Sequence, residues 1–80
     1  MPTIIRQAGF LVVIYPNDHP PPHVHVLRKD GRAKILLKCD AQKNDLVLVF
    51  GFTMKQSMDA VKIVTEANEK LLLAWRKIHG

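Results

Sequence analysis

An Asp-Gly dipeptide between two strand-forming runs most constrains how this 80-residue chain can fold. Asp30-Gly31 separates residues 23–29 from residues 32–38, and Asp-Gly is a strong signal for a two-residue type I′ hairpin turn. This turn would place Lys29 opposite Arg32 and His23 opposite Lys38. Alternation along the two strands then sorts their side chains into two faces. The core face carries Val24, Val26, Ile35 and Leu37, and the other face carries His23, His25, Leu27, Lys29, Arg32, Lys34, Leu36 and Lys38.

Three further segments extend the predicted sheet. Residues 3–6 indicate a short edge strand, and residues 10–15 and 45–50 are strand-like runs with apolar residues on both faces that end at turn residues. Such runs predict strands covered on both faces. One helix cannot cover two strands of this kind on both sides. A second covering surface is therefore expected, and another copy of the chain would supply it as a homodimer.

The C-terminal third has the pattern of a long amphipathic helix. Thr53 and Gln56 match a capping box at its start, and apolar residues then recur at spacings of three and four up to residue 78. Thr65 and Asn68 interrupt this stripe, which indicates a bend or break near residues 66–68. Trp75 is expected to be a core or interface anchor, and His79 to be a favourable positive charge at the helix end.

These elements predict an α+β fold in a single domain over residues 1–80. The expected architecture is a small antiparallel sheet of about four strands, packed against the long C-terminal helix. No apolar run approaches the roughly 20 residues that a membrane span requires, and the N-terminus lacks signal-peptide features. Cys39 is the single cysteine, expected to be small and buried, and it excludes an internal disulfide. We therefore expect a cytoplasmic protein.

Histidines gather in one short stretch. Three of the four lie at positions 19–25, beside Asp18 and around Pro20-Pro21-Pro22. The prolines predict a stiff polyproline II segment, and His23 and His25 are expected on one face of a strand. Two such imidazoles can share a metal ion, act as an acid and base pair, or contact phosphate. The alternative is a rigid connector built from ordinary loop residues.

The order of these features resembles the small bacterial proteins of the DUF4160 family. The resemblance rests on the opening Met-Pro-Thr-Ile, Gly9 before the strand to Tyr15, the Asp18-His19, Pro21-Pro22, His23 and His25 motif, and a C-terminal helix with Trp75. It implies no established activity. It does imply a neighbouring gene for a DUF2442-type protein, and a toxin–antitoxin-like module formed by the pair. The family's helical region is often richer in Trp and His than this one.

Three functions follow from the residues and the resemblance. The favoured one is a toxin–antitoxin-type component that contacts RNA, supported by a net charge of +5, and the next is a non-catalytic domain that binds a protein through residues 18–25. The toxin–antitoxin-type component could be a metal-independent ribonuclease without a cofactor. Its catalytic residues would be Asp18, His19, His23 and His25, and its nucleic-acid contacts would be Lys29, Arg32, Lys34 and Lys38. Ranked last is a module that binds one divalent transition metal through His19, His23 and His25, with Asp18 as a fourth or supporting group. The candidate partners are RNA, a DUF2442-type protein and a second copy of the chain.

Overall fold

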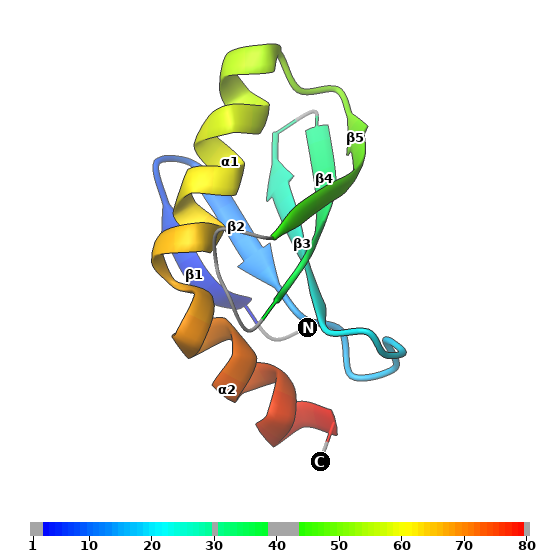
Figure 1. Cartoon of the computed structure of the whole chain (residues 1–80). Coiled ribbons are helices and arrows are strands. Elements are labelled where there is room, and N and C mark those ends of the chain that lie inside the picture. Colours follow the sequence, from blue (N-terminus) through cyan, green and yellow to red (C-terminus); the bar gives the residue numbers. More distant parts are fainter. Residues whose placement is uncertain (1–2, 30, 39–43, 80) are drawn as a thin grey trace.

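A computed structural model describes residues 3–29, 31–38 and 44–79. The described elements are five strands followed by two helices (Figure 1). They are β1 (Thr3–Gln7), β2 (Phe10–Val13), β3 (His23–Arg28), β4 (Gly31–Leu36), β5 (Asp45–Phe50), α1 (Met54–Glu66) and α2 (Asn68–His79). The strands form one antiparallel sheet whose spatial order is the chain order. The predicted α+β class is confirmed, with five strands and with the helical region divided in two.

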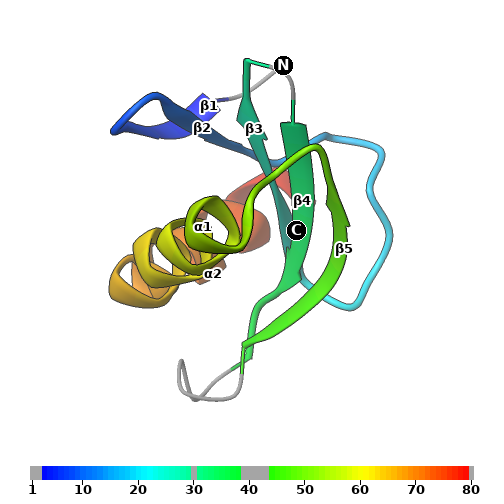
Figure 2. The ribbon, with the colours of Figure 1, turned by 90° about the horizontal axis from the view of Figure 1, so that it is seen from above.

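The molecule has one layer of strands and one layer of helices. Viewed from above, the curved sheet has both helices on one side, and the connection between β2 and β3 lies on the other side (Figure 2). The core lies between sheet and helices and contains Phe10, Val12, Ile14, Val24, Val26, Ala33, Ile35, Leu37, Ala60, Ile63, Val64, Leu71 and Trp75. The four residues assigned to the core face of the hairpin are all buried. We call the opposite side of the sheet the open face, and Leu27, Arg32, Lys34 and Phe50 lie on it.

The hairpin of β3 and β4 pairs in a register two residues away from the predicted one. His23 lies opposite Leu36 instead of Lys38, and Arg28 lies opposite Gly31. Asp30 is outside the described residues, but Gly31 is the first residue of β4. A Cβ on Gly31 would overlap with the ring of Phe52, so close packing requires this glycine. A shift of two residues leaves every side chain on its predicted face.

Glycine serves a turn at a different hairpin, between β1 and β2. Gln7 pairs with Phe10, and the two residues between them, Ala8 and Gly9, have φ values of +53° and +82°. Positive φ at both positions is the geometry of a type I′ turn. The Arg28 guanidinium donates a hydrogen bond to the Ala8 carbonyl (3.0 Å), which ties this turn to β3.

Only one of the two doubly apolar strands is interior. β2 lies between β1 and β3, and its residues are largely buried, as predicted. β5 is an edge strand, and all six of its residues are exposed. Within the described residues β5 is left uncovered, because the helices pack over the middle of the sheet. Its cover by a second copy of the chain stays a prediction.

The helices meet at a break that the sequence indicates. The capping box at Thr53 forms as predicted, with the Thr53 hydroxyl accepting from the Gln56 N–H and the Gln56 side chain accepting from the Thr53 N–H. α1 ends at Glu66 and α2 begins at Asn68. The buried Asn68 amide donates to the Lys38 carbonyl (2.8 Å) and accepts from Asn44 (2.9 Å). The polar residue that interrupts the stripe thus joins the helices to the end of the sheet.

Two further expectations from the sequence concern a membrane span and Cys39. None of the described helices is long and apolar enough to cross a membrane. Cys39 lies outside the described residues.

Candidate functional site

The connection between β2 and β3 folds back and places Asp18 over β3. The Asp18 N–H donates to the Tyr15 carbonyl, and the Tyr15 N–H donates to Asp18 Oδ2, both at 3.1 Å. These reciprocal bonds close a tight turn and orient the carboxylate. At the other end, the Leu37 N–H donates to the Pro22 carbonyl (2.9 Å). The Pro20–Pro21 bond is cis, so the proline run is not the uniform polyproline II segment expected.

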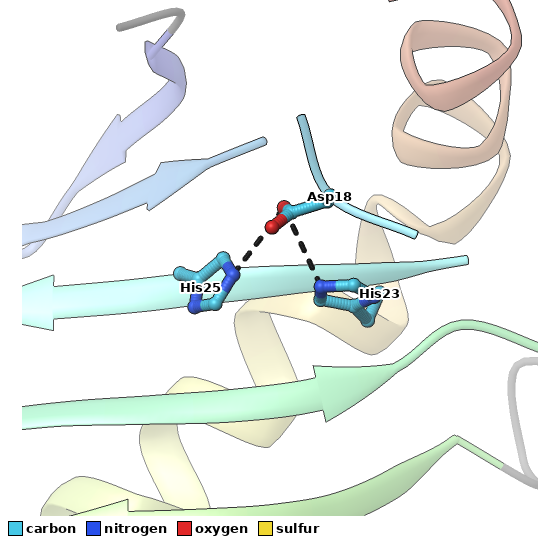
Figure 3. Close-up of side chains that lie close together, drawn as sticks. All are labelled: Asp18, His23 and His25. Atoms are coloured by element: carbon cyan, nitrogen blue, oxygen red, sulfur yellow. Dashed lines mark ion pairs between the residues drawn. The ribbon is translucent and has the colours of Figure 1, made fainter. Parts of the chain in front are cut away.

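Asp18 meets both histidines of β3. His23 and His25 lie two residues apart and point to the same side (Figure 3). Asp18 Oδ2 lies 3.4 Å from His23 Nε2 and 3.3 Å from His25 Nε2. One ligand atom from each residue lies within 4.8 Å of the other two. We call Asp18, His23 and His25 the Asp-His-His cluster.

The cluster is shielded from solvent. His23 is 4% exposed, and the His25 side chain is 26% exposed. The exposed part of His25 does not include Nε2, which is buried and has no hydrogen-bond partner in the described structure. A buried nitrogen of this kind is costly unless some group interacts with it.

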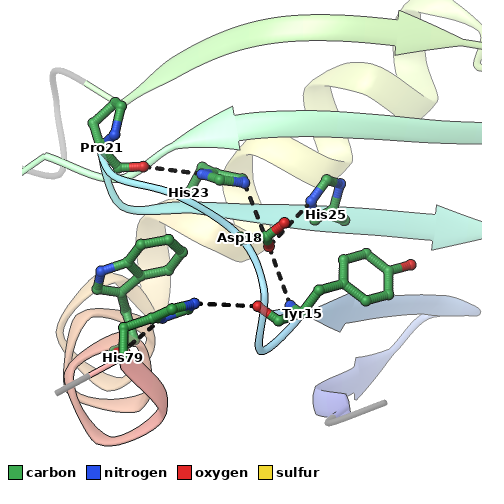
Figure 4. Close-up of polar contacts among 7 residues, drawn as sticks. Tyr15, Asp18, Pro21, His23, His25 and His79 are labelled. Carbon is green, nitrogen blue, oxygen red and sulfur yellow. Dashed lines mark hydrogen bonds and ion pairs between the residues drawn. The ribbon is translucent and has the colours of Figure 1, made fainter.

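The tautomer of His23 follows from its other ring nitrogen. Nδ1 lies 2.9 Å from the Pro21 carbonyl oxygen (Figure 4). Because a carbonyl only accepts, Nδ1 carries the proton, and the neutral ring presents a lone pair at Nε2. That lone pair faces a carboxylate oxygen, which is also an acceptor. Two acceptors in contact repel each other unless a cation, either a proton or a metal ion, lies between them.

The pKa values of His25 and Asp18 are both lowered, but by different causes. Burial lowers the pKa of His25 below its ordinary 6.5, although the Asp18 carboxylate acts in the opposite direction. His25 is therefore neutral at pH 7, and its contact with Asp18 is then not an ion pair. Burial alone would raise the pKa of Asp18, but the Tyr15 N–H and the two imidazoles outweigh burial and lower it below 3.8. Asp18 is thus a carboxylate beside neutral His25 at physiological pH.

The C-terminal helix supports the cluster from one side. The His23 ring packs against Trp75 with centroids 5.3 Å apart, and the His79 ring stacks on Trp75 at 3.7 Å. His79 also lies within hydrogen-bond distance of the Trp75 and Tyr15 carbonyls (Figure 4). His79 therefore does more than place a charge at a helix end. Sequence reasoning missed its contact with Tyr15, because 64 residues separate the two and no local pattern indicates it.

The remaining predicted site residues lie apart from the cluster or at its margin. His19 is exposed and contributes no atom to the cluster. Lys34 pairs with His25 across the β3–β4 ladder, and Arg32 is two residues further along the same face. Lys29 is exposed in the turn after β3. Lys38 follows β4, where its backbone bonds to Asn44 and Asn68.

The arrangement suits metal coordination. Metal-binding histidines commonly donate their second ring N–H to a backbone carbonyl, as His23 does toward Pro21. Two imidazoles and a carboxylate form a donor set found around zinc and non-haem iron. The same three groups can also exchange a proton, since a neutral imidazole beside a carboxylate can act as a base.

The cluster lies inside a recognised family region. The profile of the DUF4160 family, described as a domain of unknown function, matches residues 9–76. No curated protein and no solved structure matches the chain. The family match covers most of the chain and all three residues of the Asp-His-His cluster. The chain therefore belongs to the DUF4160 family.

Proposed function

We propose that this protein binds one divalent transition-metal ion through Asp18, His23 and His25. The observation that carries the proposal is the buried His25 Nε2. Among the described residues it has no hydrogen-bond partner, although a carboxylate oxygen lies 3.3 Å away. A bound metal ion would satisfy this nitrogen, the lone pair of His23 and the carboxylate together.

Distances support a metal over a shared proton. Charge-assisted N–H···O bonds are usually about 2.7–2.9 Å long, whereas the two contacts here measure 3.3 and 3.4 Å. Ligands bound at about 2.0–2.1 Å in a tetrahedral site lie roughly 3.3–3.4 Å from one another. A single proton, moreover, can bridge only one imidazole and the carboxylate. The second imidazole would remain without a partner.

The number of ligands indicates the type of centre. Structural zinc sites usually have four protein ligands, whereas catalytic ones have three and leave a position for water or substrate. Three protein ligands converge here among the described residues. Imidazole and carboxylate together suit zinc and Fe(II) better than calcium or magnesium, which prefer oxygen ligands. We propose zinc as the first metal to test, in a centre with one open position.

The decisive experiment is the metal content of untagged protein purified without chelator, measured by inductively coupled plasma mass spectrometry. We expect about one equivalent of metal, lost in His23→Gln and His25→Gln. His19→Gln is the matched control, because His19 lies in the same segment but outside the cluster. Absence of metal, together with no zinc binding in calorimetry, would refute the proposal. Equal loss in His19→Gln would refute the choice of ligands.

A second proposal is contact with RNA across the open face. Arg32 and Lys34 lie there beside the exposed apolar residues Leu48 and Phe50. Cations next to an aromatic ring provide phosphate contacts and a surface on which bases stack. We expect Arg32→Ala with Lys34→Ala to weaken binding of single-stranded RNA and to reduce its salt dependence. Fluorescence polarisation at several salt concentrations measures both quantities, and unchanged binding would refute this proposal.

Two other functions proposed from the sequence, a metal-independent ribonuclease and a toxin–antitoxin-like role, have less support from the geometry of the cluster. A metal-independent ribonuclease needs imidazole nitrogens that reach the substrate, and the burial of His23 and of His25 Nε2 gives this activity less support than metal binding. Cleavage of RNA in EDTA, lost in His25→Gln, would reverse that order. A toxin–antitoxin-like role with a DUF2442-type partner remains a proposal from family resemblance. Co-purification of the two proteins tests it.

A further inference from the structure

β5 presents an unusually apolar edge. Leu46, Val47, Leu48, Val49 and Phe50 are consecutive and between 39% and 64% exposed. An edge strand also leaves a row of backbone N–H and C=O groups without strand partners. Within the described residues, β5 pairs with β4 alone. Natural edge strands are usually protected by charge, proline or cover, and β5 has its one charge at the first residue, Asp45.

The neighbouring helix adds to this surface. Met54 and Met58 of α1 are 82% and 66% exposed, and with Val61 and Leu46 they line one continuous groove. α1 begins just after β5 and runs back in the opposite direction over the middle of the sheet (Figure 1). The six residues of β5 and the thirteen of α1 each span about 20 Å, at roughly 3.3 and 1.5 Å per residue. The groove joins the exposed face of α1 to the strand edge at Leu46, and we call the edge of β5 together with this groove the patch.

We propose that a second copy of this chain covers the patch, with β5 pairing antiparallel to the β5 of its partner about a two-fold axis. The register that uses all six residues places Asp45 opposite the partner's Phe50 and Leu46 opposite the partner's Val49. The two five-stranded sheets then become one continuous sheet. Such isologous pairing satisfies the edges of both copies at once.

The face on which each side chain lies agrees with this register. Leu46 and Val49 pair with Ile35 and Ala33 of the core face, whereas Asp45 and Phe50 pair with residues of the open face. In each of these two opposed pairs both side chains therefore point to the same side. Both registers displaced by one residue would oppose the core-face residue Leu46 to an open-face residue of the partner, either Phe50 or Leu48. The irregularity of the β4–β5 ladder falls at Val47, next to the proposed two-fold axis, which passes between Val47 and Leu48.

Charge complementarity favours a second copy over an unrelated strand. The Arg32 guanidinium lies 5.6 Å from the centre of the Phe50 ring on its own chain. In the proposed register Phe50 is opposite the partner's Asp45, so Arg32 and the partner's Asp45 flank one ring on one face. The two-fold axis generates this pair twice.

The first test is the solution mass of untagged protein by light scattering coupled to size-exclusion chromatography. We expect twice the chain mass of 9.1 kDa. Val47→Lys should give a folded monomer, and Leu73→Lys on α2 should remain a dimer. The two substitutions are matched, because Val47 is 53% and Leu73 is 55% exposed. Circular dichroism confirms that both variants fold.

The second test addresses the register. Asp45→Arg and Arg32→Asp should each weaken the dimer by at least about tenfold in sedimentation, and the double variant should restore it. A wild-type monomer at every soluble concentration would overturn the proposal, as would dissociation of Leu73→Lys to the same degree as Val47→Lys. Failure of the double variant to recover would overturn the register. None of these outcomes depends on metal binding, because β5 contributes no ligand to the cluster.

Discussion

Replacement of His25 by leucine should stabilise the folded protein without metal and destabilise it, relative to wild type, when zinc is bound. In EDTA the substitution removes a buried nitrogen that has no hydrogen-bond partner in the part of the chain that the structure describes. An unsatisfied buried polar group costs about 1–3 kcal/mol. Because the side chain is 26% exposed, we expect the lower end of that range, so the free energy of unfolding of metal-free protein should rise by about 1 kcal/mol.

With zinc, wild type should become more stable than His25→Leu. A ligand that binds only the folded state at a hundred times its dissociation constant stabilises it by about 2.7 kcal/mol. For 80 residues, an unfolding entropy of about 2.1 cal/mol/K per residue converts this energy into a rise of roughly 16 °C in Tm. His25→Leu should lose most of this increase, because one of three ligands is gone.

Differential scanning calorimetry and urea titration measure both effects. Wild type, His25→Leu and the His19→Gln control are compared in EDTA and in zinc. His19→Gln should follow wild type under both conditions. Strong destabilisation of His25→Leu in EDTA would contradict the prediction, because it would mean that Nε2 already has a partner. An equal rise in Tm with zinc for His25→Leu and for wild type would also contradict it.

Three further predictions concern the stability of the metal-free protein. Burial, opposed in part by Asp18, holds the pKa of His25 below 6.5, so the unfolded chain takes up a proton at a higher pH than the folded chain does. The free energy of unfolding in EDTA should therefore fall as the pH drops below 6.5. Urea denaturation that gives the same free energy of unfolding across this pH range would contradict the prediction. Ala8→Asn should raise stability by roughly 0.5–1 kcal/mol, because φ at Ala8 is +53° and Asn-Gly suits a type I′ turn; a lower Tm would argue against that turn. Gly31→Ala should lower stability by about 1–3 kcal/mol through overlap with the Phe52 ring, and a loss of equal size in a Phe52→Leu background would show that Phe52 is not the cause.

The fold class was predictable because its signals are local. The capping box joins residues three apart, and alternation in residues 23–27 assigns each side chain to a face within one strand. The register of the hairpin was not predictable in the same way. Asp-Gly is typical of a turn, but Gly31 is required by contact with Phe52, which lies beyond the next strand. Side-chain alternation survived this error because the shift was an even number of residues.

The stretch of sequence that carries the candidate site was predictable, but not which of its residues come together in the cluster. The spacing of His23 and His25 indicated a shared face, and Asp18 was placed beside them as a supporting group. His19, the direct neighbour of Asp18, is exposed and outside the cluster, because the turn at residues 15–18 aims the Asp18 carboxylate at β3. The support from Trp75 and His79 had no signal in the local sequence.

The sequence by itself determined the order and type of the elements, the apolar core and the stretch that carries the histidines. Periodicity, capping and turn chemistry act within a few residues, so these features can be read along the chain. Within residues 3–29, 31–38 and 44–79, tertiary structure alone decided that Asp18 and not His19 joins the two strand histidines, that His25 Nε2 is buried without a hydrogen-bond partner, and that β5 is an edge strand. Each of these depends on which distant segments meet, because burial and partnership are properties of the packed chain.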